Sequence, residues 1–434
     1  MDAVIFAFVV LFTCLFLTVP ISASVGMAAL SLWWYVPRLA TNPAYLFQAI
    51  VTTLDSYALL AVPLFILSGQ IMARGGIASR MFDFMTYFLG RYKGGLPCAI
   101  VATCMFYGAC TGAGPAVVAA VGAMAIPFLV KLKYDKVFVT ALVAVAGGLG
   151  AIIPPSIGMV FYSVITGASV GNMFLAGILP GILIGASLMI YVVFYCHRKG
   201  EARDKIDAAV DALKAKGFLK VFKDSFLALL TPFIILGGIY SGLFTPTEAA
   251  GVSVFYGLIV SCFIYKTLPF KMLPRTLYAS LHSVGPQIYI AGCCTTLARA
   301  LTLIRASQVI TDYMVSTFDS TFAILLAINV FLLFCGMFMD IISSILITTP
   351  LLWPIAQASG IHVLHFGIIM ICNLCIGYVT PPVGANLNNA FALTGISFLK
   401  IARAAVPMVI SFFLALMMIT YVPAVSLTIP LWGR

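Results

Sequence analysis

The sequence predicts an all-α integral membrane protein made of two inverted repeats, and three observations support this prediction. Of its 434 residues, 62% are apolar and only 9% are charged, whereas a soluble protein carries about 25% charged residues. Apolar runs approaching the roughly 20 residues that a membrane-crossing helix needs recur along the chain. The second half also repeats the proline and glycine pattern of the first half. Most of the chain is therefore expected to lie in lipid.

The internal repeat extends over almost the whole chain. The pair Pro381-Pro382 follows the pair Pro154-Pro155 by 227 residues. Further matched pairs, at offsets of 223 to 228 residues, are Pro63 and Pro286, Gly69 and Gly292, Pro180 and Pro407, and Thr166 and Thr394. A duplication inside a membrane protein is the usual plan of a secondary transporter.

A polar connection over residues 197–224 separates the two halves, with eight Lys or Arg and five Asp or Glu. We expect it on the cytoplasmic side, with a short solvated surface helix at 205–214. The predicted domains are a first repeat at 1–196 (scaffold 1–93, transport elements 94–170) and a second repeat at 225–434 (scaffold 225–318, transport elements 319–397, closing helix 399–428).

Each repeat is predicted to contain three scaffold spans, an arm helix, a re-entrant hairpin, a broken span and a closing helix. Apolar runs give the spans, an amphipathic stretch gives the arm, and glycine-rich or Pro-Pro interruptions give the hairpin tip and the break. In the first repeat these lie at 4–17, 22–35, 57–73, 81–92, 96–130, 137–168 and 173–196. In the second they lie at 226–240, 248–265, 277–298, 304–315, 321–355, 366–393 and 399–422.

A capping box and the distribution of basic loops predict the start of one helix and the orientation of the two halves. Thr245-Pro246-Thr247-Glu248 is a capping box that starts a helix, which gives Glu248 a structural role. Basic loops at 74–93 and 131–136 have much less basic counterparts at 297–319 and 358–363, whereas Lys266, Lys271 and Arg275 fall where the first half has almost no positive charge. By the positive-inside rule the halves are inverted, with both termini external.

The interruptions indicate where the chemistry lies, because irregular backbone at membrane depth survives only where it lines a site. Freed carbonyls and oxygen-bearing side chains suit Na+, and half-helix N-termini suit a carboxylate. We expect substrate contacts from Thr111, Gly112, Ser156, Asn386 and Asn388. We expect Na+ contacts from Cys110, Gly114, Gly150, Pro154, Gly336, Asp340, Ser343, Thr380 and Pro381.

Several motifs resemble the large membrane subunit of tripartite ATP-independent periplasmic (TRAP) transporters over essentially the full length. They are Pro154-Pro155-Ser156-Ile157, Gly171-Asn-Met-Phe-Leu-Ala-Gly-Ile-Leu-Pro-Gly181, Gly237-Gly-Ile-Tyr-Ser-Gly-Leu-Phe-Thr-Pro-Thr-Glu-Ala-Ala250, Gly336-Met-Phe-Met-Asp340, His365-Phe-Gly-Ile-Ile and Thr380-Pro-Pro-Val-Gly384. The first hairpin tip, Ala109-Cys-Thr-Gly-Ala-Gly-Pro115, and the second break, Asn386-Leu-Asn-Asn389, depart from the family pattern.

The resemblance implies an elevator-type symporter in a bacterial or archaeal cytoplasmic membrane, with Na+ as the coupling ion and no organic cofactor. It also implies a small four-helix membrane subunit as partner, and a periplasmic binding protein that delivers a small organic acid. The substrate class it implies is a C4-dicarboxylate, a sialic acid or a related carboxylate.

Other classes remain to be weighed. A stand-alone anion/Na+ symporter would use the same architecture without a binding protein. An enzyme is disfavoured because the catalytic motifs are absent and His362-x-x-His365 falls in a predicted external loop without an acidic companion. A channel conflicts with the paired interruptions. The formal charge of +11 lies in short loops, which disfavours nucleic-acid binding.

Overall fold

Helices account for all the regular structure in the described part of the chain. A computed structural model describes residues 2–36, 43–318 and 320–431. The first and last residues of the two predicted repeats, 1 and 434, lie outside these ranges. Within them, seven helices are long and apolar enough to cross a membrane, or eight if one bent pair counts as a single span. The prediction of an all-helical, multi-span membrane protein is confirmed.

The first half contains ten helices within the described residues. They are α1 Asp2–Phe16, α2 Ile21–Tyr35, α3 Pro43–Leu54, α4 Ala61–Arg74, α5 Ile77–Leu89, α6 Gly95–Thr111, α7 Gly114–Lys131, α8 Lys136–Gly147, α9 Ile157–Thr166 and α10 Val170–Lys199. A 3-10 turn, Gly148–Ala151, extends α8 into the break before α9. Helix α3 was not predicted. Its 12 residues are too few for a span, and its mixed composition gave no clear signal.

The second half follows the same kind of order. Its helices are α11 Arg203–Lys214, α12 Phe218–Tyr240, α13 Pro246–Leu258, α14 Leu273–Leu303, α15 Ala306–Thr317, α16 Thr321–Phe338, α17 Ile341–Ala358, α18 Val363–Gly377, α19 Ala385–Thr394, α20 Phe398–Tyr421 and α21 Ala424–Leu431. The predicted closing helix is wrong at its end. It stops at Tyr421, and Pro423, which has no backbone N–H to continue the ladder, precedes a separate helix α21.

The capping box at the start of α13 is confirmed. The Thr245 N–H donates to Glu248 Oε2 at 2.8 Å, and the Glu248 N–H donates to Thr245 Oγ1 at 3.3 Å. Both bonds satisfy N–H groups that have no partner within the helix. Glu248 therefore has the structural role expected of it.

Helices α8 and α18 form the centre of the molecule, and each is followed by a short interruption and a further helix, α9 or α19. Helix α8 is buried from Phe138 to Gly147, and α18 is buried from Leu364 to Gly377. Such all-round burial explains why both sequences are apolar on every face. Helices α6, α7 and α20 pack on α8, while α10, α16 and α20 pack on α18.

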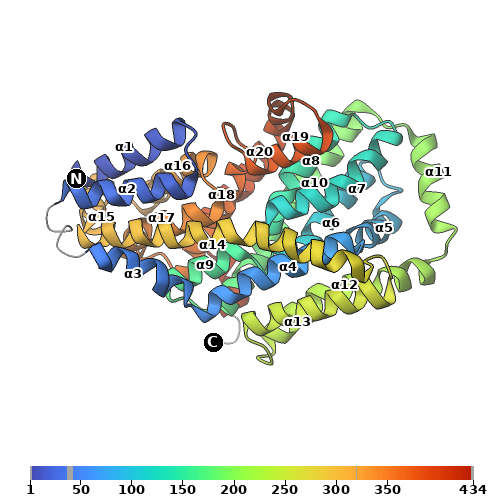
Figure 1. Ribbon diagram of the computed structural model, residues 1–434. Coiled ribbons are helices and arrows are strands. Elements are labelled where there is room, and N and C mark those ends of the chain that lie inside the picture. The colour runs from blue at the N-terminus through green and yellow to red at the C-terminus, as the bar shows by residue number, and fades with distance from the viewer. Residues whose placement is uncertain (1, 37–42, 319, 432–434) are drawn as a thin grey trace.

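A second group of helices surrounds the long helix α14, which crosses the view in Figure 1 from α15 at the left. Helix α14 contacts α2, α3 and α4, and α13 packs along α4. Helix α12 packs on α13 and on α5. This group also contacts α6 and α17 of the two hairpins, so the hairpins lie between it and the broken helices.

The surface helix predicted in the connection between the halves is present as α11, and its apolar face packs against the protein. Helix α11 buries Ile206, Val210 and Leu213, at the spacing of one helix face, and it packs on α5. Arg91 and Asp211 form an exposed ion pair at 2.9 Å. The polar residues that suggested a solvated helix lie on the opposite face.

Glu201 joins three segments just before α11. Its side chain is only 3% exposed. It accepts hydrogen bonds from the Gly94 N–H at 3.0 Å and from the Tyr134 hydroxyl at 2.6 Å, and it pairs with Arg203. Gly94 begins the first hairpin, and Tyr134 lies in the turn between α7 and α8. The connection is therefore fastened to both ends of that hairpin.

Candidate functional site

Each hairpin crosses a broken span at a pair of glycines. A Cβ built on Gly108 of α6 would lie 2.6 Å from Gly150 Cα, and a Cβ built on Gly377 would lie 2.4 Å from the Gly336 carbonyl group. Real Cβ atoms essentially never approach another atom this closely, so a larger residue would force the crossing backbones apart. The four glycines bring each hairpin tip close to a break.

Both tips and both breaks contribute to one central cavity of about 680 Å³. This volume is in the range of small-molecule sites. Its wall includes the first residues of four helices: Gly114 and Pro115 of α7, Ile157 and Gly158 of α9, Ile341 and Ile342 of α17, and Ala385 of α19. The N-terminus of a helix carries partial positive charge and free N–H groups. The cavity is thus surrounded by features that favour an anion.

The tip of the first hairpin is tied to the first break. Gly112 has a left-handed backbone with φ +65°, and its carbonyl accepts from the Ile157 N–H at 3.2 Å. Thr111, Gly112 and Gly114 line the cavity. Cys110 is fully buried, with its Sγ 3.5 Å from the Phe106 carbonyl, behind the lining.

The first break is built by residues that lie behind the wall. Ser156 caps α9, since it accepts from the Met159 N–H at 3.5 Å and donates to the Ala151 carbonyl at 2.6 Å. Its side chain is fully buried. Pro154 is joined to Pro155 by a cis peptide bond. Ser156, Pro154 and Gly150 therefore shape the break without lining the cavity.

The tip of the second hairpin places a carboxylate on the wall. Asp340 caps α17, since its Oδ2 accepts from the N–H groups of Ile342 at 3.1 Å and Ser343 at 3.5 Å. The Ser343 hydroxyl donates to the other carboxylate oxygen. Asp340 lines the cavity, and Ser343 is buried beside it. The buried Ser344 hydroxyl oxygen has no hydrogen-bond partner in the described part of the chain.

The second break supplies amides. Asn386 donates from Nδ2 to the Ala144 carbonyl at 2.9 Å, while its Oδ1 is buried and has no hydrogen-bond partner among the described residues. Asn389 donates to the Pro115 carbonyl at 3.1 Å and lines the cavity. Thr380 donates to the Ile376 carbonyl at 2.8 Å. Asn388 is exposed and bonds the Val383 carbonyl at 2.7 Å.

The predicted site residues thus fall into two sets. Those on the cavity wall are Thr111, Gly112, Gly114 and Asp340. Those behind it or away from it are Cys110, Gly150, Pro154, Ser156, Gly336, Ser343, Thr380, Pro381, Asn386 and Asn388. Sequence reasoning missed four polar wall residues on the second group of helices: Gln70 and Arg74 of α4, and Ser283 and Gln287 of α14. Their spacing of four residues on each helix was the available signal.

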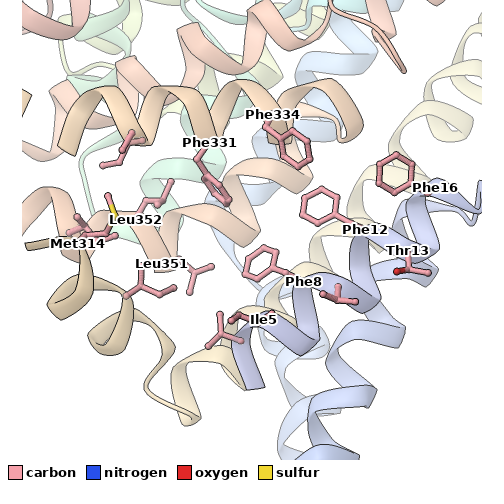
Figure 2. A pocket seen from close by; sticks show the side chains of 16 residues that line it. Ile5, Phe8, Phe12, Thr13, Phe16, Met314, Phe331, Phe334, Leu351 and Leu352 are labelled. Carbon is pink, nitrogen blue, oxygen red and sulfur yellow. The ribbon is translucent and has the colours of Figure 1, made fainter. Parts of the chain in front are cut away.

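A second cavity, of about 630 Å³, is apolar (Figure 2). Phe8, Phe12 and Phe16 of α1 face Phe331 and Phe334 of α16. Its only polar lining side chain among the described residues is Thr13. Among the described residues it offers no charged side chain to bind a carboxylate, so the central cavity is the candidate site.

The His362-x-x-His365 motif has structural roles. The Leu364 N–H donates to His362 Nδ1 at 3.2 Å, which caps α18. His365 is buried inside α18, where its Nδ1 lies 2.7 Å from Ser426 Oγ. The expectation that both histidines lie in an external loop is wrong for His365.

The fold and the central cavity define a multi-pass membrane permease. The fold is similar to that of the YdaH transporter of Alcanivorax borkumensis, with a TM-score of 0.58 and 13% sequence identity over 89% of this chain and 90% of that one. Residues 8–425 match the family model described as "Tripartite ATP-independent periplasmic transporter, DctM component". The chain belongs to this family, and it is a permease component rather than an enzyme.

The relatives of this chain are named for different substrates. The chain is 40% identical to the C4-dicarboxylate TRAP transporter large permease protein DctM of Pseudomonas aeruginosa, covering 88% of each chain. It is 31% identical to the sialic acid TRAP transporter large permease protein SiaM of Vibrio cholerae, covering 96% of each. It is 38% identical to the isethionate TRAP transporter permease protein DctMQ of Oleidesulfovibrio alaskensis, covering 98% of this chain but only 65% of that protein.

Proposed function

We propose that the protein carries a small organic anion across the cytoplasmic membrane by sodium-driven symport, as the large permease subunit of a TRAP system. The observation that supports this most is the meeting of four helix N-termini at one cavity between two hairpin tips. The N–H groups and partial positive charge of such termini stabilise a bound carboxylate.

The substrate class is a C4-dicarboxylate, a sialic acid or a related carboxylate. The named relatives transport C4-dicarboxylate, sialic acid and isethionate. All three are small anions, and a cavity of about 680 Å³ accommodates molecules of this size.

Sodium is the coupling ion because the tips and breaks are rich in oxygen. Hard cations prefer carboxylate, hydroxyl and amide oxygens. The Asp340 carboxylate, Asn386 Oδ1 and Ser344 Oγ supply oxygens of this kind, and the last two have no hydrogen-bond partner among the described residues. Asn386 is thereby reassigned in our proposal from the substrate to the cation. Glycine and proline positions at the breaks would offer backbone carbonyls.

Transport proceeds by an elevator movement of one body against another. The moving body comprises both hairpins and both broken spans together with α10 and α20, since these two helices pack on α6, α8 and α18. The scaffold comprises the helices grouped around α14, with the arms α5 and α15. The matched order of elements in the two halves supports two inverted repeats, each contributing to both bodies.

The cavity is expected to open toward the cytoplasm. From the first tip its wall follows α7 through Ala116, Ala119, Ala120 and Ala123, toward Lys131 at the basic end of the hairpin. Basic loops favour the cytoplasmic side. This arrangement corresponds to an inward-facing state, with both chain termini on the external side.

The other components follow from the family. A tripartite system implies a small membrane subunit and a periplasmic binding protein. The name DctMQ of the longer relative, of which this chain covers only 65%, favours a DctQ-type partner for the small subunit.

The test is uptake into proteoliposomes that contain this chain and its small subunit. Radiolabelled succinate, N-acetylneuraminate and isethionate are offered with and without an inward Na+ gradient and the purified binding protein. We expect uptake of one acid to require both. Uptake with Na+ alone would establish the stand-alone symporter, and uptake indifferent to Na+ would overturn the proposed coupling.

A further inference from the structure

Two pairs of polar residues line the scaffold side of the central cavity. Gln70 and Arg74 are one helical turn apart on α4, and Ser283 and Gln287 are one turn apart on α14. Residues four apart share a helix face, so both helices present a polar pair to the same space. Within the residues that the structure describes, the Gln287 Oε1 atom is buried without a hydrogen-bond partner.

Arg74 is the only basic residue on the cavity wall among the described residues, and Asp340 of the second hairpin is the only acidic one. One guanidinium nitrogen of Arg74 donates to Thr276 Oγ1 at 3.1 Å. Within the described residues no carboxylate lies within 4.0 Å of it. Arginine offers five N–H donors in a planar fork that matches a carboxylate. Most of the Arg74 donors are therefore left to bind a ligand.

We propose that Arg74 is the counter-ion for the substrate's anionic group in the inward-facing state. This inference rests on the proposed function and deepens it. The four helix N-termini belong to the hairpins and broken spans, which move with the substrate. Arg74 belongs to the scaffold, which does not. Its contact with the substrate therefore exists only when the moving body stands opposite α4, so Arg74 sets affinity on the cytoplasmic side alone.

A purely structural role for Arg74 predicts something different. A cation at the last turn of a helix is favoured by the helix dipole, and the bond to Thr276 anchors α4 to α14. Either role would be served without a ligand, and loss of either would affect both transport directions. The two accounts are separated by comparing affinity at the two membrane faces.

The experiment uses the complete permease with its small subunit, in proteoliposomes with uniform orientation confirmed by protease cleavage of the 197–224 connection. KM is measured at each face for whichever of succinate, N-acetylneuraminate and isethionate the wild type transports. For Arg74→Gln we expect KM at the cytoplasmic face to rise about 10- to 100-fold, since a hydrogen bond to a charged group is lost. KM at the external face should change by less than about threefold.

Three matched variants serve as controls. Arg275→Gln removes the same charge from an exposed residue beside Thr276, and it should match the wild type. Thr276→Val removes the anchor but keeps the guanidinium, and it too should retain its cytoplasmic KM. Arg74→Lys keeps the charge but loses the planar fork, and its cytoplasmic KM should rise by only a few fold. If Arg74→Gln does not fold, Arg74→Lys tests the proposal instead. An unchanged KM of Arg74→Lys at both faces would then overturn it.

An equal rise of KM at both faces, or the same loss in Thr276→Val, would identify a structural anchor and overturn the assignment. Wild-type transport with unchanged KM in Arg74→Gln would overturn it as well, while leaving the proposed function intact. Absence of Na+-driven uptake in the wild type would instead refute the proposed function.

Discussion

At the scale of single residues, the glycine pairs decide how closely the hairpins approach the broken spans. Gly377 meets the backbone of Gly336, and Gly108 meets Gly150. Neither contact involves the flexible end of a side chain, so the backbone itself would have to shift for a methyl group. A larger residue at positions of this kind is expected to destabilise the protein, whereas other glycines, such as Gly237, face open space.

Gly377→Ala should therefore destabilise the protein by about 1–3 kcal/mol, the usual cost of overpacking. Gly237→Ala is the matched control, since a Cβ there has no atom within 4 Å and alanine is the better helix former. Thermal unfolding in detergent measures both. Equal melting temperatures for Gly377→Ala and the wild type would show that the crossing is looser than described.

Tyr134 makes the stability of the fold depend on pH in the alkaline range. Burial, and donation of its hydroxyl to Glu201, raise the pKa of Tyr134 well above its usual value. The folded state thus holds this proton more tightly than the unfolded state, whose tyrosine pKa is about 10. The resulting stabilisation is fully present below about pH 10 and is lost as the pH rises beyond it.

Denaturation between pH 8 and 11 tests this effect. The free energy of unfolding of the wild type should fall more steeply above about pH 10 than that of Tyr134→Phe, which has no proton to lose. Tyr92→Phe is the control, because the Tyr92 side chain is exposed, and it should follow the wild type. Parallel pH profiles for wild type and Tyr134→Phe would contradict the prediction.

At the scale of elements, helix α17 begins at a residue with two possible roles. Asp340 caps the helix and also lines the cavity. Asparagine caps helices about as well as aspartate, but it carries no charge. The substitution therefore separates the capping role from the proposed cation role.

For Asp340→Asn we expect stability within about 1 kcal/mol of the wild type and at least a tenfold loss of Na+-dependent uptake. The control is Asp135→Asn, because Asp135 caps α8 by accepting from the Val137 N–H at 2.8 Å and lies outside the central cavity. Thermal unfolding and proteoliposome uptake are measured on both. Full Na+-dependent uptake in Asp340→Asn would remove the carboxylate from the cation site.

Elements with a strong local signal were predictable from sequence. The glycine-rich interruption between Lys93 and Lys131 predicted a break between two helices, and α6 and α7 meet there. The capping box placed the start of α13 correctly. Helix α3 was missed because its pattern is short and mixed. The surface helix α11 was predicted from its apolar spacing, but its partner α5 was not, because only tertiary contact reveals it.

The candidate site was predictable in part for a related reason. Thr111, Gly112, Gly114 and Asp340 sit at interruptions, which sequence makes visible. Arg74 sits at the end of an ordinary apolar span, where the positive-inside rule already accounts for a basic residue. Which side of α4 faces the cavity depends on packing between distant segments, which spacing alone does not specify.

At the scale of the whole molecule, the proposed movement requires the arm α5 and the hairpin helix α7 to separate. Phe82 of α5 and Phe128 of α7 lie edge to face, with ring centroids 5.7 Å apart. Replacing both by cysteine and joining them with a short bifunctional thiol reagent should abolish uptake, while Na+ binding persists. Undiminished uptake by the joined protein would refute the elevator movement.

A second joined pair distinguishes locking from general damage. Phe138 of α8 and Tyr195 of α10 are stacked with centroids 3.9 Å apart, and both belong to the proposed moving body. Joining cysteines at these positions should leave uptake close to that of the unjoined variant. Because the chain has eleven native cysteines, the site of joining is confirmed by mass spectrometry.

The length of helix α14 makes its position sensitive to the thickness of the bilayer. Its 31 residues extend about 46 Å at 1.5 Å per residue, against a hydrocarbon core of about 30 Å. A helix of this length fits the core by inclining or by projecting from it. Thinner or thicker lipid would change that inclination, and with it the position of Ser283 and Gln287. Lipid chain length thereby becomes a variable that acts directly on the scaffold wall of the cavity.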